Sequence, residues 1–456
     1  MSFDARSVSM GGSGVVTARS HNASLFNPAL LIDHDPRRQT RLHGHSYVGA
    51  RLIDRDNFLA TAQDFRDRYR GMSLADLIDS DIDISPTEFE GGADLRNATS
   101  AIRAAQDDIN GLSDRPLRAS ASYGFAFGYP VGHWALGGYH REYAVLGSVV
   151  RVAEEDNHAI NQVTGTIDAF ANVLDELALL PEYRNERGMT LAEVVDRASG
   201  LMESVQALDN FIDFRQMRDD VRADDYRGRN VQDYLREPLP EEFLSSIETR
   251  GAQVTEQALS LARSFPGRGR FPGDLHVGIT LKDVEFTSIH YTQLANEYSL
   301  SDYSEDAFRR THNRFNMDVG LLYDLSGHWQ VGLVVRNLVP YDFEDVAGDR
   351  IPLRPLARAG IGYRGHNVRL SLDADLSRNE PLGFDPDKQY VSLGAEWFAW
   401  RNTALRAGVR TNVVDGATLP SLGVGLGGRH GHFDVAVARS FNGDEYGLGL
   451  QAGLAF

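Results

Sequence analysis

The stretch Glu445-Tyr446-Gly447-Leu448-Gly449-Leu450-Gln451-Ala452-Gly453-Leu454-Ala455-Phe456 alternates between two kinds of residue. Because successive side chains of a strand point to opposite faces, its larger apolar residues share one face, and mostly glycine and glutamine occupy the other. One face suits lipid and the other suits a lumen. Lipid cannot satisfy backbone polar groups, so strands cross a membrane only as a closed barrel. The stretch therefore predicts a barrel strand; the alternative is an amphipathic strand of a soluble β-protein.

The composition fits a barrel better than a bundle of membrane helices. Charged residues make up 24% of the 456 residues, and the mean hydropathy is -0.33, which suits a barrel with a polar inner face. The segment 119–140 lacks Asp, Glu, Lys and Arg, but Pro130 and several glycines divide it into two strands. Two or three soluble domains remain the alternative that the length allows.

Charge and cysteine content exclude several classes of function. The formal net charge of -18 argues against a nucleic-acid partner, which requires a basic face. The chain has no cysteine, which excludes disulfides and thiolate metal sites. Met1-Ser2-Phe3-Asp4 lacks the basic start and apolar core of a signal peptide, so we expect the signal of an exported protein to be absent from this sequence.

Alternation and turn residues predict a barrel of about fourteen antiparallel strands over residues 40–456. We place the strands at 40–53, 118–129, 133–150, 272–281, 285–298, 312–324, 329–340, 354–364, 367–377, 388–398, 402–412, 418–428, 431–440 and 445–456. Counted back from the last strand, long and short connections alternate. Maintaining this alternation requires a tight turn at Lys282-Asp283-Val284-Glu285.

Two long insertions interrupt the strand pattern, at residues 54–117 and 151–271, and both have helical periodicity. In the second, the predicted helical pattern continues from Phe243 to Phe265. With Phe456 at the periplasmic rim, both insertions fall on the extracellular side, where we expect a helical cap over the barrel mouth. A separate soluble domain is the alternative for the second insertion. Four tryptophans near the tight turns predict an interfacial girdle: Trp134, Trp329, Trp397 and Trp400.

Residues 1–39 precede the first strand and form a compact, non-repetitive segment. Gly11, Gly12 and Gly14 permit tight turns, and Pro28 holds Asn27 extended.

This N-terminal pattern resembles the start of mature FadL-type outer-membrane transporters and the barrel family labelled conjugal-transfer TraF-like. The resemblance rests on Ser9-Met10-Gly11-Gly12-Ser13-Gly14 and on Asn27-Pro28-Ala29-Leu30. It implies that residues 1–39 form a hatch inside the barrel, with gate residues Gly11, Gly12, Gly14, Asn27, Pro28 and Ala29. It also implies passive uptake of a hydrophobic small molecule of the fatty acid or hydrocarbon type. The absence of a Cys-x-x-Cys pair excludes the thioredoxin-like protein that shares the TraF name.

The last strand resembles the C-terminal signal of bacterial outer-membrane barrels. This resemblance assigns Tyr446, Leu454 and Phe456 to recognition by the barrel-assembly machinery, with outer-membrane lipid as the other partner.

Two groups of residues suggest metal sites. Asp79, Asp81, Asp83 and Glu90 have the acidic spacing of a calcium loop, but Ile84 stands where that loop requires glycine. His43-Gly44-His45 and His430-Gly431-His432 each place two imidazoles on one side of a strand, although a turn role for the Gly-His pairs is the simpler interpretation. We expect no cofactor.

The chain contains no nucleophile elbow, phosphate loop or zinc signature, so we expect no enzymatic activity. The sequence therefore predicts a cell outer-membrane channel for hydrophobic small molecules. The alternative function is a structural or partner-docking barrel linked to conjugation or secretion, with the helical insertions as the docking surface.

Overall fold

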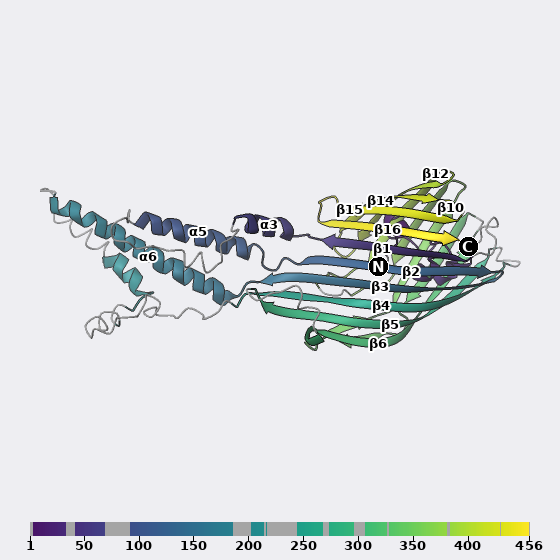
Figure 1. The fold of residues 1–456 in the computed structure, drawn as a ribbon, viewed down its shortest axis with the longest axis horizontal. Helices are drawn as coiled ribbons and strands as arrows, with labels where there is room; N and C mark the ends of the chain where they lie inside the picture. Colours follow the sequence, from purple (N-terminus) through teal and green to yellow (C-terminus); the bar gives the residue numbers. More distant parts are fainter. Residues whose placement is uncertain are drawn as a thin grey trace.

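In the computed structural model the chain forms a closed antiparallel barrel of fourteen strands, in which β1 pairs with β16 (Figure 1). The structure describes residues 3–32, 42–68, 92–185, 202–213, 216, 244–267, 273–295, 306–325, 328–380, 384–428 and 430–455. The barrel strands are β1 (His43–Ile53), β2 (Leu117–Val131), β3 (Trp134–Arg151), β4 (Ser246–Phe265), β5 (Leu275–Leu294), β6 (Arg309–Asp324), β7 (Trp329–Arg336), β10 (Leu356–Arg364), β11 (Val368–Asp375), β12 (Tyr390–Trp400), β13 (Thr403–Asn412), β14 (Thr418–Gly427), β15 (Gly431–Arg439) and β16 (Glu445–Ala455). The predicted fold class is confirmed.

The strand number is correct although two of the predicted elements are wrong. Residues 246–265, assigned to the helical insertion, form β4, and the predicted turn at 282–285 lies inside the continuous strand β5. The turn was predicted only because the alternation of long and short connections required it, and the Lys282 side chain instead points into the lumen and pairs with Asp318 at 2.8 Å. The additional strand β4 and the absence of a turn within β5 compensate each other in the strand count. The strands that flank the insertions therefore run in the predicted directions. The prediction that both insertions leave the same end of the barrel therefore holds.

The outer surface of the barrel carries the apolar residues that the alternation predicts. On β16, Tyr446, Leu448 and Leu454 are exposed, while Gln451 is buried on the lumen side. Trp134, Trp329, Trp397 and Trp400 are all exposed and stand beside tight turns, as expected for a girdle.

The helices of the insertions extend away from the barrel mouth along the long axis of the molecule (Figure 1). We call α3 (Phe58–Arg68), α5 (Gly92–Asn110) and α6 (Glu154–Asn185) the helical stalk. Arg103 of α5 pairs with Asp168 of α6 at 2.7 Å. The predicted cap is wrong for these described helices, because they project outward and do not cover the mouth. Among the helices in the described ranges, none combines the length and apolar character needed to cross a membrane.

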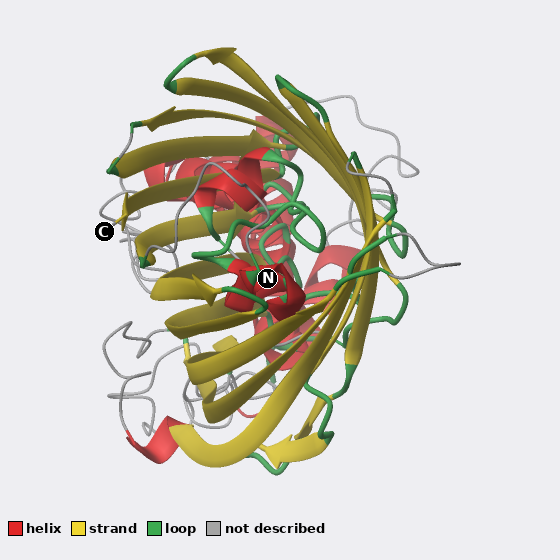
Figure 2. Cartoon of the chain, turned by 90° about the vertical axis from the view of Figure 1, so that its right-hand side faces the viewer, coloured by secondary structure: helices red, strands yellow, loops and turns green. Residues whose placement is uncertain are grey.

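The N-terminal segment, residues 3–32, lies inside the ring of strands (Figure 2). It contains α1 (Ala5–Ser9), α2 (Ala23–Phe26) and the 3-10 helix η1 (Pro28–Leu31). Helix α1 contacts β13 to β16, and η1 contacts β4, β5 and β6, so the segment spans the lumen from one wall to the other. Between β7 and β10 the chain also forms a hairpin of β8 (Tyr341–Glu344) and β9 (Arg350–Leu353). A single 3-10 turn, η4 (Asp306–Phe308), precedes β6.

Candidate gate in the barrel lumen

A buried carboxylate on the wall holds the N-terminal segment. Glu396 of β12 points into the lumen because it occupies an inward position of the alternation, and it is fully buried. The guanidinium of Arg6 donates to both of its oxygens, from Nη2 to Oε2 at 2.8 Å and from Nε to Oε1 at 3.1 Å. Such a fork-shaped pair fixes both distance and orientation.

A second arginine extends this contact along the wall. Arg406 of β13 donates from Nε to Glu396 Oε1 at 2.8 Å and from Nη1 to Asp434 at 2.7 Å. Arg406 and Asp434 are buried as well. We call Arg6, Glu396, Arg406 and Asp434 the charge clamp. Buried charges are costly unless each is paired, so the clamp favours the state in which the segment is docked.

The predicted gate glycines lie where the segment touches β11 and β13, on the same wall as the charge clamp. Gly11 and Gly12 have positive φ angles of 69° and 81°, and a Cβ on Gly11 would stand 2.5 Å from the carbonyl oxygen of Val409. The amide of Gly14 donates to Asp373 at 2.7 Å. The positions of Gly11 and Gly12 therefore require glycine for backbone conformation, and that of Gly11 also for its close approach to the wall.

Asn27, Pro28 and Ala29 form the other contact of the segment with the wall. Asn27 Oδ1 accepts the Ala29 amide at 3.1 Å, and Asn27 Nδ2 donates to the carbonyl of Leu321 in β6 at 3.1 Å. The wall makes room with glycine: a Cβ on Gly320 would stand 1.9 Å from Asn27 Oδ1. All six predicted gate residues thus lie in the docked segment, at or next to its contacts with the barrel.

Four histidines meet where the segment crosses the seam between the first and last strands. The ring of His21 lies 5.0 Å from that of His45 in β1 and 4.9 Å from that of His432 in β15, measured between centroids, and His43 is 6.4 Å away. Nε2 of His21 is buried without a hydrogen-bond partner. Burial, followed by the charges of His45 and His432, lowers the pKa of His21 well below its usual value. His21 is therefore neutral in the docked segment at pH 7.

Asp4 anchors the same region of the segment. Its carboxylate accepts the Ser7 amide at 2.9 Å and the Asn22 side chain at 3.1 Å, and it lies 3.4 Å from His45 Nε2. Burial raises the pKa of Asp4, but His45 and these hydrogen bonds outweigh burial, so the pKa lies below its usual value. Asp4 is consequently charged in the docked segment.

Acidification should loosen the docked segment through His21. Below about pH 6.5, a released His21 takes up a proton and the docked one does not, so docking weakens by up to about 1.4 kcal/mol per pH unit. His43, His45, His432, Arg19 and, beside His45, Asp4 are the charged or titratable groups facing this site. We expect trypsin cleavage of residues 3–32 to increase between pH 7.5 and pH 5. In His21→Asn, the free energy of docking should depend on pH through one bound proton fewer than in the wild type. An unchanged pH dependence would contradict this assignment.

The space beside the docked segment is small. A cavity of about 30 Å³ lies between the segment and the wall, with Phe3, Val8 and Leu419 among its apolar lining residues. This volume is on the order of one water molecule. The side chains around this cavity therefore leave no room in it for a larger solute.

A second element inside the barrel lies nearer the helical stalk. The β8–β9 hairpin folds against the inner wall, where the ring of Phe343 stacks on Phe286 of β5 with centroids 4.4 Å apart. Ala252, Val254 and Val284 belong to the same buried apolar cluster. Apolar side chains at inward positions are unusual for a water-filled channel, whose interior is polar.

A family model described as "F plasmid transfer operon, TraF, protein" matches residues 24–375. The chain belongs to this family. None of the curated proteins compared with this TraF-family chain matches it significantly. Among solved structures, it is similar to the Ralstonia pickettii toluene transporter TbuX, with 11% identity, 99% and 97% of the two chains covered and a TM-score of 0.45. The P. putida toluene transporter TodX gives 9% identity, coverage of 99% and 97%, and a TM-score of 0.41.

Sequence reasoning did not identify the charge clamp of this TraF-family barrel. The available signal was a set of charged residues at inward strand positions, such as Glu396 and Arg406. The two histidine pairs of the sequence indicated only part of the histidine cluster. His43, His45 and His432 do meet, but around His21, which was not singled out, and His430 is exposed.

Two further predicted sites of the TraF-family chain are only partly within the described residues. The calcium-loop residues Asp79, Asp81, Asp83 and Glu90 lie outside them. In the assembly signal, Tyr446 and Leu454 are exposed on the outer face, and Phe456 lies outside the described residues.

Proposed function

We propose that this protein is an outer-membrane channel for passive uptake of hydrophobic small molecules of the fatty acid or hydrocarbon type, and that its N-terminal segment is the gate. The observation that supports the proposal is a segment of the same chain that packs across the lumen and is held by the charge clamp and by glycine contacts. Such contacts can separate and re-form without breaking a covalent bond. A closed barrel with an apolar outer surface suits the outer membrane, because its backbone polar groups are paired and its outer side chains can contact lipid.

The apolar cluster under the β8–β9 hairpin supports a hydrophobic cargo. A solute that displaces Phe343 from Phe286 would meet Val254 and Val284, and it would leave water for a dry surface. We propose that the end of β16 at Ala455 lies at the periplasmic rim, so that the hairpin and the stalk face outside and this cluster is the first apolar surface that the solute meets. We propose that recognition of the last strand by the barrel-assembly machinery sets this orientation.

The proposal is tested by the uptake of radiolabelled oleate and toluene into outer-membrane vesicles or cells that contain the full chain. We expect uptake above that of the empty vector, and a further increase when residues 3–32 are deleted. Heat-modifiable migration on gels confirms that each variant is folded. Uptake equal to the vector control for both solutes, with a folded barrel, would reject the channel.

The helical stalk favours a second candidate function, docking of a partner outside the barrel. α6 alone has 32 residues, and the stalk makes no part of the lumen (Figure 1). Replacing residues 58–110 and 154–243, which contain the three helices of the stalk, with short loops should leave uptake unchanged if the stalk serves docking. Loss of uptake in a folded barrel would assign the stalk to transport instead.

A further inference from the structure

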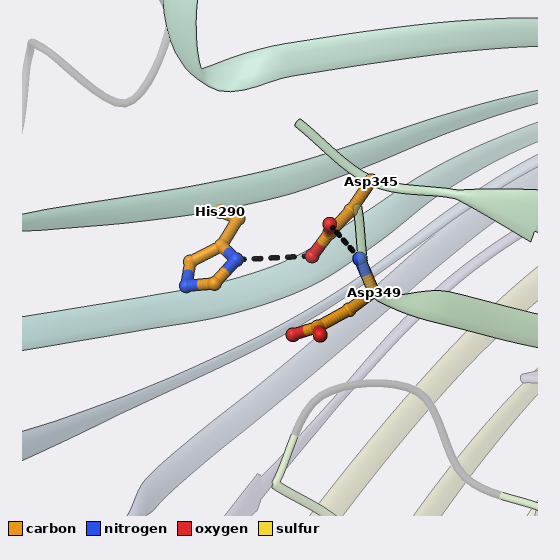
Figure 3. A group of neighbouring side chains, drawn as sticks. All are labelled: His290, Asp345 and Asp349. Carbon is orange, nitrogen blue, oxygen red and sulfur yellow. Dashed lines mark hydrogen bonds and ion pairs between the residues drawn. The ribbon is translucent and has the colours of Figure 1, made fainter. Parts of the chain in front are cut away.

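We propose that His290, Asp345 and Asp349 form a binding site for a divalent transition-metal ion of the Zn²⁺ class. One ligand atom from each residue lies within 4.8 Å of the other two, with the three side chains converging from the wall and the hairpin (Figure 3). His290 belongs to β5, and the two aspartates belong to the turn between β8 and β9. The site therefore joins two elements that are more than fifty residues apart in the chain.

The turn holds Asp345 in position for a ligand. Its Oδ1 accepts the backbone amides of Ala347 at 2.9 Å and of Asp349 at 2.8 Å. Its Oδ2 is thereby directed at Nδ1 of His290, 2.9 Å away. Asp345 is 5% exposed, so its carboxylate is fixed before any ion arrives. An ion entering between Nδ1 and Oδ2 would replace the hydrogen bond with two metal bonds.

The other nitrogen of the imidazole faces a carboxylate. Histidines that bind a metal through one nitrogen commonly donate the other N–H to a carboxylate. Nε2 of His290 lies 3.4 Å from Oε1 of Glu248 in β4. A carboxylate at this nitrogen holds a proton on Nε2 and raises the basicity of the ligand. The proton that Nδ1 shares with Asp345 is released to solvent when the ion binds.

Arg250 limits how Asp349 can bind. Its Nη1 lies 3.3 Å from Oδ2 of Asp349, and its Nε pairs with Glu248. One oxygen of Asp349 is thus directed to the arginine, and the other remains for the ion. Arg250 also keeps the net charge of the region low, which favours a single divalent ion over two.

The ligand set selects the class of ion. An imidazole nitrogen suits Zn²⁺, Ni²⁺, Cu²⁺ and Fe²⁺, whereas Ca²⁺ and Mg²⁺ prefer oxygen ligands alone. Three protein ligands leave at least one position for water, as in open zinc sites. A bound ion would tie the β8–β9 hairpin to the wall. This binding depends only on the fold, so it is independent of whether the barrel transports a solute.

The test is a calorimetric titration of the tag-free, EDTA-treated full chain in detergent with ZnCl₂. We expect one Zn²⁺ per chain, with affinity lowered at least about tenfold in both His290→Gln and Asp349→Asn. Because the side chain of Asp349 is 58% exposed, its substitution carries little risk for folding. Glu248→Gln should lower the affinity less than the loss of a ligand.

The matched control is His312→Gln. His312 also faces the hairpin, with its Nε2 3.0 Å from the carbonyl oxygen of Glu344, but it belongs to no cluster of ligand atoms in the described residues. Its substitution should leave Zn²⁺ affinity unchanged. No binding by the wild-type chain at millimolar Zn²⁺, or binding that neither His290→Gln nor Asp349→Asn weakens, would overturn the proposal.

Discussion

Replacing Glu396 with alanine should release the N-terminal segment from the barrel wall. The substitution leaves Arg6 and Arg406 buried around an empty position, and breaking a buried ion pair on one side costs about 3–5 kcal/mol. This free energy destabilises the docked state, because the Arg6 guanidinium is hydrated again only when the segment leaves the wall. We expect trypsin to cleave at Arg6 and Arg19 in the variant under conditions in which the wild-type segment is protected. The barrel itself should keep its heat-modifiable migration.

Glu155→Ala is the matched control, because Glu155 is an exposed glutamate of α6. It should leave the cleavage pattern unchanged. Arg6→Ala with Glu396→Ala should cost less than the sum of the two single substitutions, since the second removes a partner that is already lost. Wild-type protection in Glu396→Ala would show that the charge clamp does not hold the segment.

Gly320→Ala should displace the other contact of the segment. The added Cβ would stand 1.9 Å from Asn27 Oδ1 and 2.9 Å from Cδ of Pro28, so Asn27 must give up its bond to the Leu321 carbonyl. Inserting a methyl group into a packed site costs about 1–3 kcal/mol. We expect hydrogen exchange of residues 23–32 to accelerate by roughly one to two orders of magnitude, which is the same free energy expressed as a rate.

Gly428→Ala provides the control for Gly320→Ala, because a Cβ at Gly428 meets no atom within 4 Å. It should leave exchange in residues 23–32 at the wild-type rate. If Gly320→Ala also leaves that rate unchanged, the Asn27 contact contributes nothing to docking.

The alternation of apolar and small residues predicted the barrel because side-chain direction in a strand is local. Tyr446, Leu448 and Leu454 lie on the outer face that their spacing required. The same reasoning failed for β4, where apolar residues between Phe243 and Phe265 also fit a helical spacing. The turn at residues 282–285 was wrong because, with β4 missed, the alternation of connection lengths required an extra turn. Lys282 is instead an inward residue of β5 whose partner lies on the neighbouring strand β6. Only the fold supplied the partner, Asp318.

The gate was predictable in part. Glycine and proline mark backbone constraints that are visible in the sequence, so Gly11, Gly12 and Pro28 were identified as gate residues. The charge clamp was not visible, because Arg6 and Glu396 are 390 residues apart and meet only when the barrel closes around the segment. The proposed metal site also depends on a long-range contact, between β5 and the β8–β9 turn.

The central claim is that a solute passes only when the N-terminal segment moves, and a disulfide lock tests it directly. Ser13 of the segment and Ser371 of β11 have hydroxyl oxygens 2.7 Å apart, and the chain contains no cysteine of its own. In Ser13→Cys/Ser371→Cys, oxidation should abolish oleate uptake and a reductant should restore it, while each single cysteine variant behaves as wild type. Equal uptake before and after reduction, with the crosslink verified by mass spectrometry, would contradict the account.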